Sequence, residues 1–177
     1  MPDSAAASAP DPGLARVNAL SPEEFATEFG SCLDVRRWIG ELRDRRPFAS
    51  RSALLEAADE LARTLTDDEV AAALARHPRI GERAAGTGAE STWSRGEQEG
   101  FSAGEAEVRG RFAAAQADYE RRFGRIYLVC AEGRPAGELL ADLTRRMAND
   151  PATEARVVAD ELRKIALQRV GKVLDRR

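Results

Sequence analysis

The sequence predicts an all-α fold: a single domain of about seven or eight helices, with one buried extended segment over residues 126–131. Helix start signals recur along the chain, and apolar side chains follow them at the spacing of one helical face. Residues 126–131 form the single strongly β-prone run, and they carry no charge. Because the sequence shows no second strand to pair with this run, we expect it to be threaded between helices.

The composition indicates one globular domain without an attraction to polyanions. The chain has 177 residues, of which 43% are hydrophobic and 32% are charged, so it can bury a substantial core. Its 27 basic and 30 acidic residues leave a formal net charge of -3. No overall field therefore draws the protein to nucleic acid or to an anionic membrane, and we expect neither as a partner.

Several features favour a cytoplasmic protein. No window approaches the ~20 apolar residues of a membrane span. The start of the chain is rich in Ala, Ser and Pro and lacks the leader of a signal peptide, so we expect residues 1–17 to be a disordered tail and residues 18–177 to be the domain. Cys32 and Cys130 stand far apart, which favours two thiols of a reducing compartment, with a disulfide as the alternative.

The first helices are predicted by their start and stop signals. Residues 21–24 combine a hydroxyl cap, a first-turn proline and a carboxylate three residues after the cap, so a helix should run to about Gly30. Residues 35–45 carry apolar side chains at helical spacing. Pro47 should end this second helix, because the residue before a proline avoids the α region.

Two more helices should precede the only histidine. Ser50 or Ser52 can cap the first of them, and its apolar stripe extends to Leu65. Thr66 should begin the second helix, which continues to Arg76.

The middle of the chain predicts a loop followed by two helices. Residues 81–92 contain glycines and charges without periodicity, which is typical of a loop. Ser94 should cap the next helix, with Glu97 as the reciprocal partner of a capping box. A longer helix should open at residues 102–105 and end at Gly124.

Two helices should complete the domain, one over residues 135–149 and one from Pro151 to about Leu174. The last helix is apolar around much of its surface, which indicates that it is buried. No internal repeat appears in the sequence.

The candidate chemistry centres on His77, the only histidine. It falls just after a predicted helix end, where the helix dipole favours a cationic imidazole, and Pro78 prevents the helix from continuing. An imidazole can give and take protons near neutral pH, which suits it to acid/base catalysis. A lone histidine at a helix end is more often a capping or surface residue, so the neighbouring sequence has to decide between the two interpretations.

The neighbouring sequence favours catalysis. The string His-Pro-Arg-Ile-Gly over residues 77–81, followed by Trp-Ser-Arg-Gly-Glu-Gln over residues 93–98, resembles the paired signature of the 2-oxo-4-hydroxy-4-carboxy-5-ureidoimidazoline (OHCU) decarboxylases. Further strings agree in order and spacing, and the resemblance extends from about Leu20 to Leu174; these strings cover residues 46–48, 123–131, 146–149 and 164–169. Agreement of several uncommon strings is specific, although any one of them would be weak evidence.

The resemblance implies an all-helical enzyme, in most cases a homodimer, that uses no cofactor and no metal. Its reaction would be decarboxylation of OHCU, a small-molecule substrate, to (S)-allantoin and carbon dioxide, the last step of urate oxidation in purine catabolism. The resemblance implies three catalytic residues: His77, Glu97 and Arg169. It also implies the following substrate-binding residues: Pro78, Ser94, Arg95, Gly96, Gln98, Tyr127, Leu128, Val129, Cys130 and Ala131.

These residue types suit the implied chemistry. Arg169 could pair with the substrate carboxylate, because a planar guanidinium binds a carboxylate in bidentate geometry. Glu97 within ~4 to 6 Å of His77 would favour the imidazolium and orient it for proton transfer. An extended segment over residues 127–131 with few internal partners would offer its amide and carbonyl groups to the urea-like part of the substrate.

Other interpretations stay open at this stage. Ser94 and Glu97 can serve only as a capping box, and Arg146 competes with Arg169 for the substrate carboxylate. A helical interaction module would explain the amphipathic pattern, but it does not predict His77 and Glu97 in one pocket. A metal enzyme is disfavoured, because one histidine and two distant cysteines supply few ligands. A nucleic-acid binder could use only the arginine-rich face of the last helix.

Overall fold

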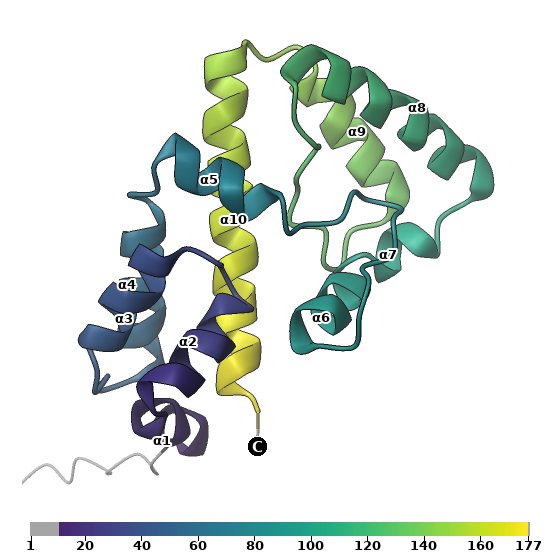
Figure 1. The fold of residues 1–177 in the computed structure, drawn as a ribbon. Helices are drawn as coiled ribbons and strands as arrows, with labels where there is room; N and C mark the ends of the chain where they lie inside the picture. The colour runs from purple at the N-terminus through teal and green to yellow at the C-terminus, as the bar shows by residue number, and fades with distance from the viewer. Residues whose placement is uncertain (1–10, 177) are drawn as a thin grey trace, which may run out of the picture.

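The structure, a computed structural model, describes residues 11–176 and confirms the all-α prediction (Figure 1). Within these residues there are ten helices and no strand, so the predicted number of seven or eight was too low. The helices are α1 (Pro12–Ala19), α2 (Pro22–Gly30), α3 (Arg36–Asp44), α4 (Arg51–Ala62), α5 (Asp67–Leu74), α6 (Ala89–Glu97), α7 (Glu99–Ser102), α8 (Ala106–Phe123), α9 (Ala136–Arg146) and α10 (Pro151–Leu174).

Helix α1 corrects the predicted disordered tail. The part of that prediction that concerns residues 1–10 lies outside the described residues. Residues 12–17, however, are helical: Asp11 accepts a hydrogen bond from the Leu14 amide at 3.0 Å, and Pro12 occupies the first turn. Leu14 and Val17 are buried in the core, so this helix is held by packing as well as by its cap.

The predicted caps of three helices, Ser21, Ser50 and Thr66, are confirmed. The side chains of Ser21 and Thr66 each accept a hydrogen bond from the backbone amide three residues later. The glutamate at that position accepts one from the amide of the cap residue, which completes two capping boxes. Ser50 caps α4. Helix α10 begins at Pro151 as predicted, and its cap, Asp150, was not part of the prediction. These helices begin where local side chains satisfy amides that have no partner within the helix.

The predicted cap of α6 was wrong. The helix begins at Ala89 after Gly88, which supplies no side-chain cap, so the loop before it ends earlier than expected. Ser94 lies inside the helix, and its hydroxyl contacts a distant helix instead of its own backbone. Helix α8 also begins later than predicted, after the extra short helix α7, and ends as expected at the left-handed Gly124 with φ 67°.

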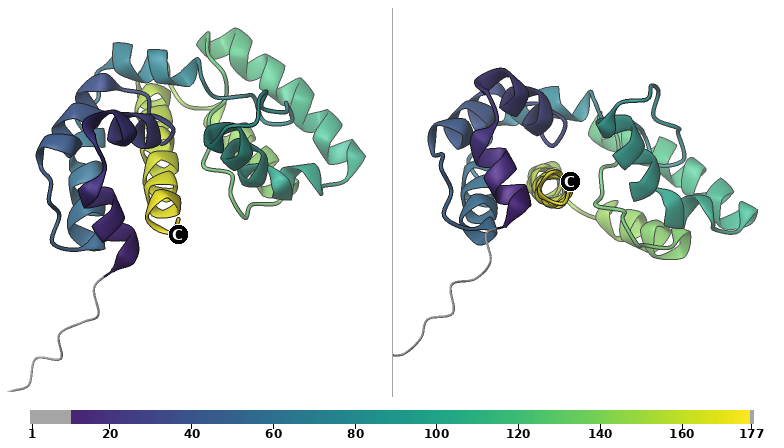
Figure 2. Two further views of the ribbon diagram at one scale, coloured as in Figure 1. Left: turned by 60° about the horizontal axis from the view of Figure 1, so that its bottom comes forward. Right: turned by 90° about the horizontal axis from the view of Figure 1, so that it is seen from below.

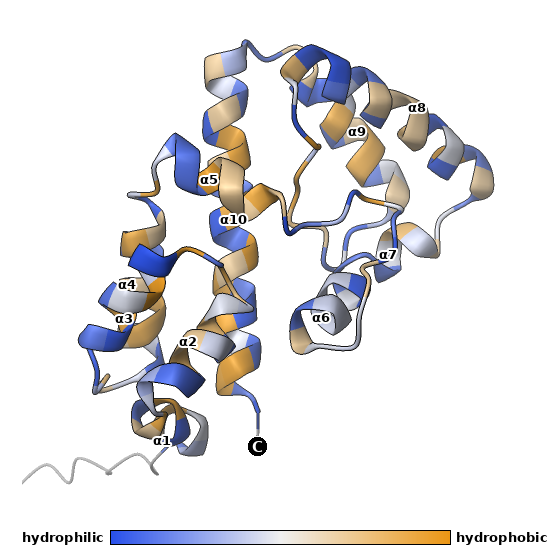
Figure 3. Ribbon diagram, in the orientation of Figure 1, coloured by the Kyte–Doolittle hydropathy of each residue, from blue (hydrophilic) through white to orange (hydrophobic). Residues whose placement is uncertain are grey.

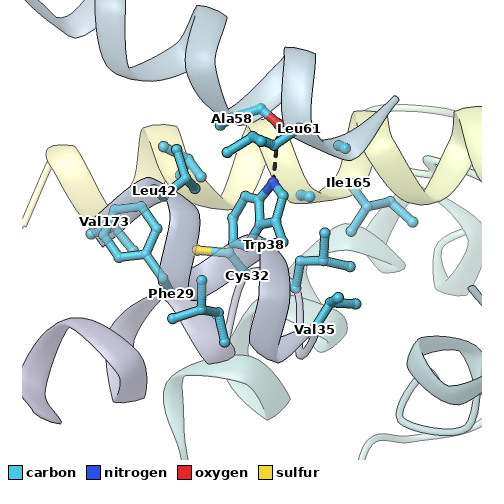
Figure 4. Packing of buried hydrophobic residues seen from close by; sticks show 14 of the residues in the cluster. Phe29, Cys32, Val35, Trp38, Leu42, Ala58, Leu61, Ile165 and Val173 are labelled. Atoms are coloured by element: carbon cyan, nitrogen blue, oxygen red, sulfur yellow. Dashed lines mark hydrogen bonds between the residues drawn. The ribbon is translucent and has the colours of Figure 1, made fainter. Parts of the chain in front are cut away.

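Helix α10 lies between two groups of helices. Seen along its axis, α10 has α1–α5 on one side and α6–α9 on the other (Figure 2). The first core cluster unites α1–α5 with α10, and it includes Trp38, whose indole donates to the Ala58 carbonyl at 3.0 Å (Figure 4). The second core cluster lies mainly between α8 and α9. Apolar residues recur in bands along α9 and α10 (Figure 3).

The predicted extended segment joins the two core clusters. Residues 126–131 form neither helix nor strand, and four of the last five are buried. Leu128 packs in the first core cluster, whereas Tyr127, Val129 and Ala131 pack in the second. This alternation is the side-chain period of an extended chain. The prediction of a buried extended segment is therefore confirmed.

Two smaller expectations concern thiols and membranes. Cys32 and Cys130 are both free thiols, as predicted. No helix between residues 11 and 176 is long and apolar enough to cross a membrane.

Candidate active site

A small cavity lies where the two groups of helices meet the extended segment. Its volume is about 20 Å³, close to the space of one water molecule. Its walls come from the segment that follows α5, from α6 and the residue after it, from the extended segment and from α10. The lining residues are His77, Pro78, Ile80, Ser94, Glu97, Gln98, Tyr127, Leu128, Val129, Ala131 and Ile165. A ring with several substituents can enter only if these walls move apart.

Beside this cavity, Arg169 from α10 meets Glu97 and Ser94 from α6. Its Nε donates to Glu97 Oε1 at 2.8 Å, and its Nη2 donates to Glu97 Oε2 at 2.9 Å and to Ser94 Oγ at 3.0 Å. Nη1 donates to the Ser31 carbonyl at 3.2 Å. All three side chains are buried, with Arg169 only 1% exposed. This fork-to-fork pair is the strongest common geometry for a guanidinium and a carboxylate.

The helical period explains why α6 supplies these two side chains. Ser94 and Glu97 are three residues apart and therefore lie on one face of the helix. Arg95 and Gly96 lie on another face and do not line the cavity. Arg95 instead donates to the carbonyls of Ala84 and Gly86, so it holds the preceding loop. The structure therefore does not bring Arg95 and Gly96, two predicted substrate-binding residues, to the cavity wall beside Glu97.

His77 reaches the cavity from the turn that follows α5. Its backbone amide donates to the Leu74 carbonyl at 3.0 Å, which continues the helical path by one turn. Burial, followed by the charge of Arg169, lowers the pKa of His77 to about 4, although Glu97 opposes both effects. Near neutral pH this pKa favours the neutral imidazole, whereas the sequence analysis expected Glu97 to favour the imidazolium; desolvation outweighs the neighbouring carboxylate.

Gln98 lines the cavity, but its side-chain amide is hydrogen-bonded to the backbone of the segment that follows His77. Its Oε1 accepts from the Gly81 amide at 2.9 Å, and its Nε2 donates to the Arg79 carbonyl at 3.2 Å. Gln116 of α8, which sequence reasoning missed, adds a bond from Nε2 to the Ile80 carbonyl at 3.2 Å. Two glutamines thus fix residues 79–81. The sequence did contain a signal for Gln116: it is a polar residue on the otherwise apolar face of α8, and a polar side chain there needs a hydrogen-bond partner.

Arg146 does not compete with Arg169 for the cavity. It pairs with Glu154 at 2.6 Å, and it donates from Nη1 to the Leu128 carbonyl at 2.7 Å. Its guanidinium also lies over the Tyr127 ring, 4.5 Å from the centroid. Arg146 therefore supports the extended segment from behind, and the alternative that it binds the same group as Arg169 is not supported.

Three further residues of the site were outside the sequence prediction. Ile80 and Ile165 form apolar walls of the cavity. Lys172 lies one turn beyond Arg169, with its ammonium 3.7 Å from Glu97 Oε1 and 2.9 Å from Glu132 Oε1. The predicted Cys130 does not line the cavity, since its side chain packs against the first core cluster.

Comparison with known proteins identifies the family of the chain. The family described as OHCU decarboxylase matches residues 18–171. The 2-oxo-4-hydroxy-4-carboxy-5-ureidoimidazoline decarboxylase of Amia calva is 30% identical over 169 residues, which cover 91% of this chain and 94% of that protein. The uric acid degradation bifunctional protein of Bacillus sp. (strain TB-90) is 23% identical over 163 residues, and these cover 90% of this chain but 32% of that longer protein.

Solved structures share the fold. A crystal structure of OHCU decarboxylase in the presence of (S)-allantoin has a TM-score of 0.70 and 24% identity, covering 84% of this chain and 98% of that one. A crystal structure of (S)-allantoin synthase has a TM-score of 0.69 and 16% identity, covering 92% of this chain and 54% of that one. Fold and sequence together place the protein among all-helical carboxy-lyases. The chain belongs to the OHCU decarboxylase family.

Proposed function

We propose that this protein decarboxylates OHCU to (S)-allantoin and carbon dioxide in urate degradation, with His77 moving the proton that sets the configuration of the product. One observation carries the proposal for the site. The only histidine of the chain shares a cavity wall with Glu97, which Arg169 holds by two hydrogen bonds. An interaction module has no need of such a buried arrangement, since a buried ion pair is often no more stabilising than apolar residues of the same volume.

The substrate can release carbon dioxide without an external electron sink. Its carboxylate is on a ring carbon that also bears a hydroxyl, next to a carbon–nitrogen double bond that accepts the electron pair. A neutral His77 can then take the proton of the hydroxyl and return a proton to the neighbouring ring carbon, while the ring nitrogen takes its proton from solvent. Because the imidazole is fixed on one side of the ring, it protonates one face only.

The structure changes the expected task of Arg169. Two of its nitrogens are committed to Glu97 and Ser94, so a bidentate bond to the substrate carboxylate would require Glu97 to leave. We propose instead that Arg169 orients Glu97 and supplies a positive charge beside the bound anion. Glu97 then directs the imidazole, and the Ser94 hydroxyl stays within reach of the substrate.

The experiment uses substrate generated freshly from urate by the two preceding oxidative steps. The purified protein should give optically active allantoin without an added cofactor, followed by circular dichroism of the product. The His77→Ala variant should lose about 10² to 10⁴ in rate and give racemic product, because positioned acid/base catalysis is worth about that factor. Arg63→Ala, at an exposed position far from the cavity, is the control. Racemic product at the uncatalysed rate from the unmodified protein would refute the proposal.

We also propose that the protein is a homodimer, as the family resemblance implies. Sedimentation equilibrium at micromolar concentration should give twice the chain mass of 19.3 kDa. A single species at the mass of one chain, in a preparation that turns over substrate, would show that the dimer is not needed.

A further inference from the structure

Residues 127–131 place their backbone in a defined orientation. The side chains of Tyr127, Val129 and Ala131 pack in the second core cluster, and those of Leu128 and Cys130 pack against the first. In such an extended chain, the amide and the carbonyl of one residue point toward the same edge, and the next residue uses the opposite edge. Leu128 and Cys130 therefore share one edge, and Val129 uses the other.

Two charged side chains bind the edge of Leu128 and Cys130. Arg146 Nη1 donates to the Leu128 carbonyl at 2.7 Å, and Glu161 Oε2 accepts from the Cys130 amide at 2.7 Å. The Arg146 side chain is 3% exposed, and that of Glu161 is 13% exposed. Both bonds are therefore charge-assisted and largely shielded from water. The charge of Glu161 also contributes, after burial, to raising the pKa of Cys130 to about 11.

These two bonds act on the peptide groups on either side of Val129. In a trans peptide the carbonyl and the amide point in opposite directions. The Leu128 carbonyl shares its peptide group with the Val129 amide, and the Cys130 amide shares its group with the Val129 carbonyl. The amide and carbonyl of Val129 thus point away from Arg146 and Glu161, and Val129 lines the cavity. Within residues 11–176, neither group of Val129 has a hydrogen-bond partner.

We propose that Arg146 and Glu161 are positioning residues that polarise the two peptide groups around Val129 and aim a strengthened donor and acceptor at the substrate. A cation at a carbonyl makes the amide of the same peptide group a better donor, and an anion at an amide makes the attached carbonyl a better acceptor. The amide and the carbonyl of Val129 are then complementary to the neighbouring C=O and N–H groups of a urea or ureide. The inference rests on the proposed function. To the backbone contact that the family resemblance already implies for this segment, it adds the two charged residues that position and strengthen that contact.

The charges are held in place by their own partners. Arg146 is anchored by Glu154, and the other oxygen of Glu161 lies 2.9 Å from Lys164. Removing Arg146 would leave Glu154, which is 1% exposed, without its cation, and the loss of stability would obscure any effect on the site. Glu161 is therefore the residue to change, because it lies at the edge of the core.

The first test reads the polarised bond directly. Protein labelled with ¹⁵N-cysteine should give two amide signals, one from each cysteine of the chain. In Glu161→Ala the Cys130 amide proton should move upfield, because it loses a short bond to a carboxylate, while the Cys32 signal stays in place. An unchanged Cys130 signal would overturn the proposal, whatever the activity of the protein.

The second test separates binding from catalysis. Glu161→Ala should raise KM for OHCU and Kd for (S)-allantoin about 3- to 10-fold and leave kcat within about twofold, because the bond strengthens binding without taking part in proton transfer. Glu161→Gln keeps an acceptor oxygen without the charge, so its KM should lie between those of the unmodified protein and Glu161→Ala. Asp160→Asn removes the same charge from the neighbouring position, where the carboxylate pairs with Arg163 and Lys164, and should leave KM unchanged.

The outcomes distinguish this inference from the proposed function. A KM change below about twofold in Glu161→Ala, or an equal change in Asp160→Asn, would overturn the role of Glu161 while the enzyme remains a decarboxylase. No turnover by the unmodified protein would refute the proposed function and the substrate contact together, and the ¹⁵N experiment would still test the bond between Glu161 and Cys130.

Discussion

At the scale of single residues, the site places the one imidazole where its charged form is disfavoured. Burial and Arg169 both act against protonation of His77, and Glu97 offsets only part of their effect. A neutral imidazole is suited to accept the first proton of the reaction. The imidazolium it becomes is then a stronger acid than histidine in water, so it returns the proton readily.

The lowered pKa of His77 predicts a specific dependence of stability on pH. The folded pKa is about 4, below the ordinary 6.5, so between these values the unfolded chain binds more protons. The free energy of unfolding should therefore fall as the pH drops through this window. Between about pH 7 and about pH 4.5, the unmodified protein should lose about 2 kcal/mol more than His77→Gln. Urea unfolding at the two pH values measures this difference, and parallel losses in both proteins would place the folded pKa near its ordinary value.

The Glu97 and Arg169 pair predicts that stability and activity separate. Glu97→Leu and Arg169→Met should each cost about 3 to 5 kcal/mol. The first leaves the buried Arg169 without a carboxylate, and the second leaves the buried Glu97 with the more distant Lys172, 3.7 Å away. The double variant removes both charges and should be more stable than either single variant, yet inactive. Chemical denaturation measures the free energy of unfolding of each variant, and the circular dichroism assay measures its activity. If the loss of stability in the double variant equals the sum of the two single losses, the two side chains do not act as a pair.

At the scale of helices, local chemistry explains which boundaries could be predicted from the sequence. The side chains of Ser21, Thr66 and Asp150 accept hydrogen bonds from amides three residues later, so their helices begin where the local sequence predicts. Ser94 carries the same local pattern with Glu97, but both are recruited by Arg169, 75 and 72 residues away. A tertiary ion pair therefore overrides the local preference, and a single-sequence pattern contains no information about it.

Helix α8 offers a matched pair of glycines with opposite roles. Gly110 lies exposed inside the helix, and Gly124 ends it with φ 67°; an added Cβ would meet nothing within 4 Å at either position. Gly110→Ala should stabilise the protein by about 0.5 to 1 kcal/mol, because it removes freedom from the unfolded chain. Gly124→Ala should destabilise it by about 1 kcal/mol, because alanine disfavours the left-handed region. Thermal unfolding compares the two, and shifts of the same sign would contradict this explanation.

At the scale of the whole molecule, the site lies at the meeting of two cores that the sequence pattern did not separate. The all-α class and the buried extended run could be predicted, because helical periodicity and a single uncharged β-prone run are local features. The convergence of His77, Glu97 and Arg169 came from the family resemblance alone, since it depends on α10 passing between α1–α5 and α6–α9. The volume of the cavity, and the bonds of Arg146 to the Leu128 carbonyl and of Glu161 to the Cys130 amide, were likewise beyond any local pattern.

The extended segment predicts that the two cores unfold together. Its side chains alternate between them, and its polar groups are tied to α9 and α10, so neither core can open without exposing it. Leu143→Ala creates a cavity in the second core and should cost about 2 to 5 kcal/mol. In a Trp93→Phe background, Trp38 is the only remaining tryptophan and reports on the first core. Its fluorescence midpoint in urea should fall together with the far-UV circular dichroism midpoint. A Trp38 transition that stays in place while half the helical signal is lost would show two independent units, and the cavity between them would then be a flexible junction instead of a fixed site.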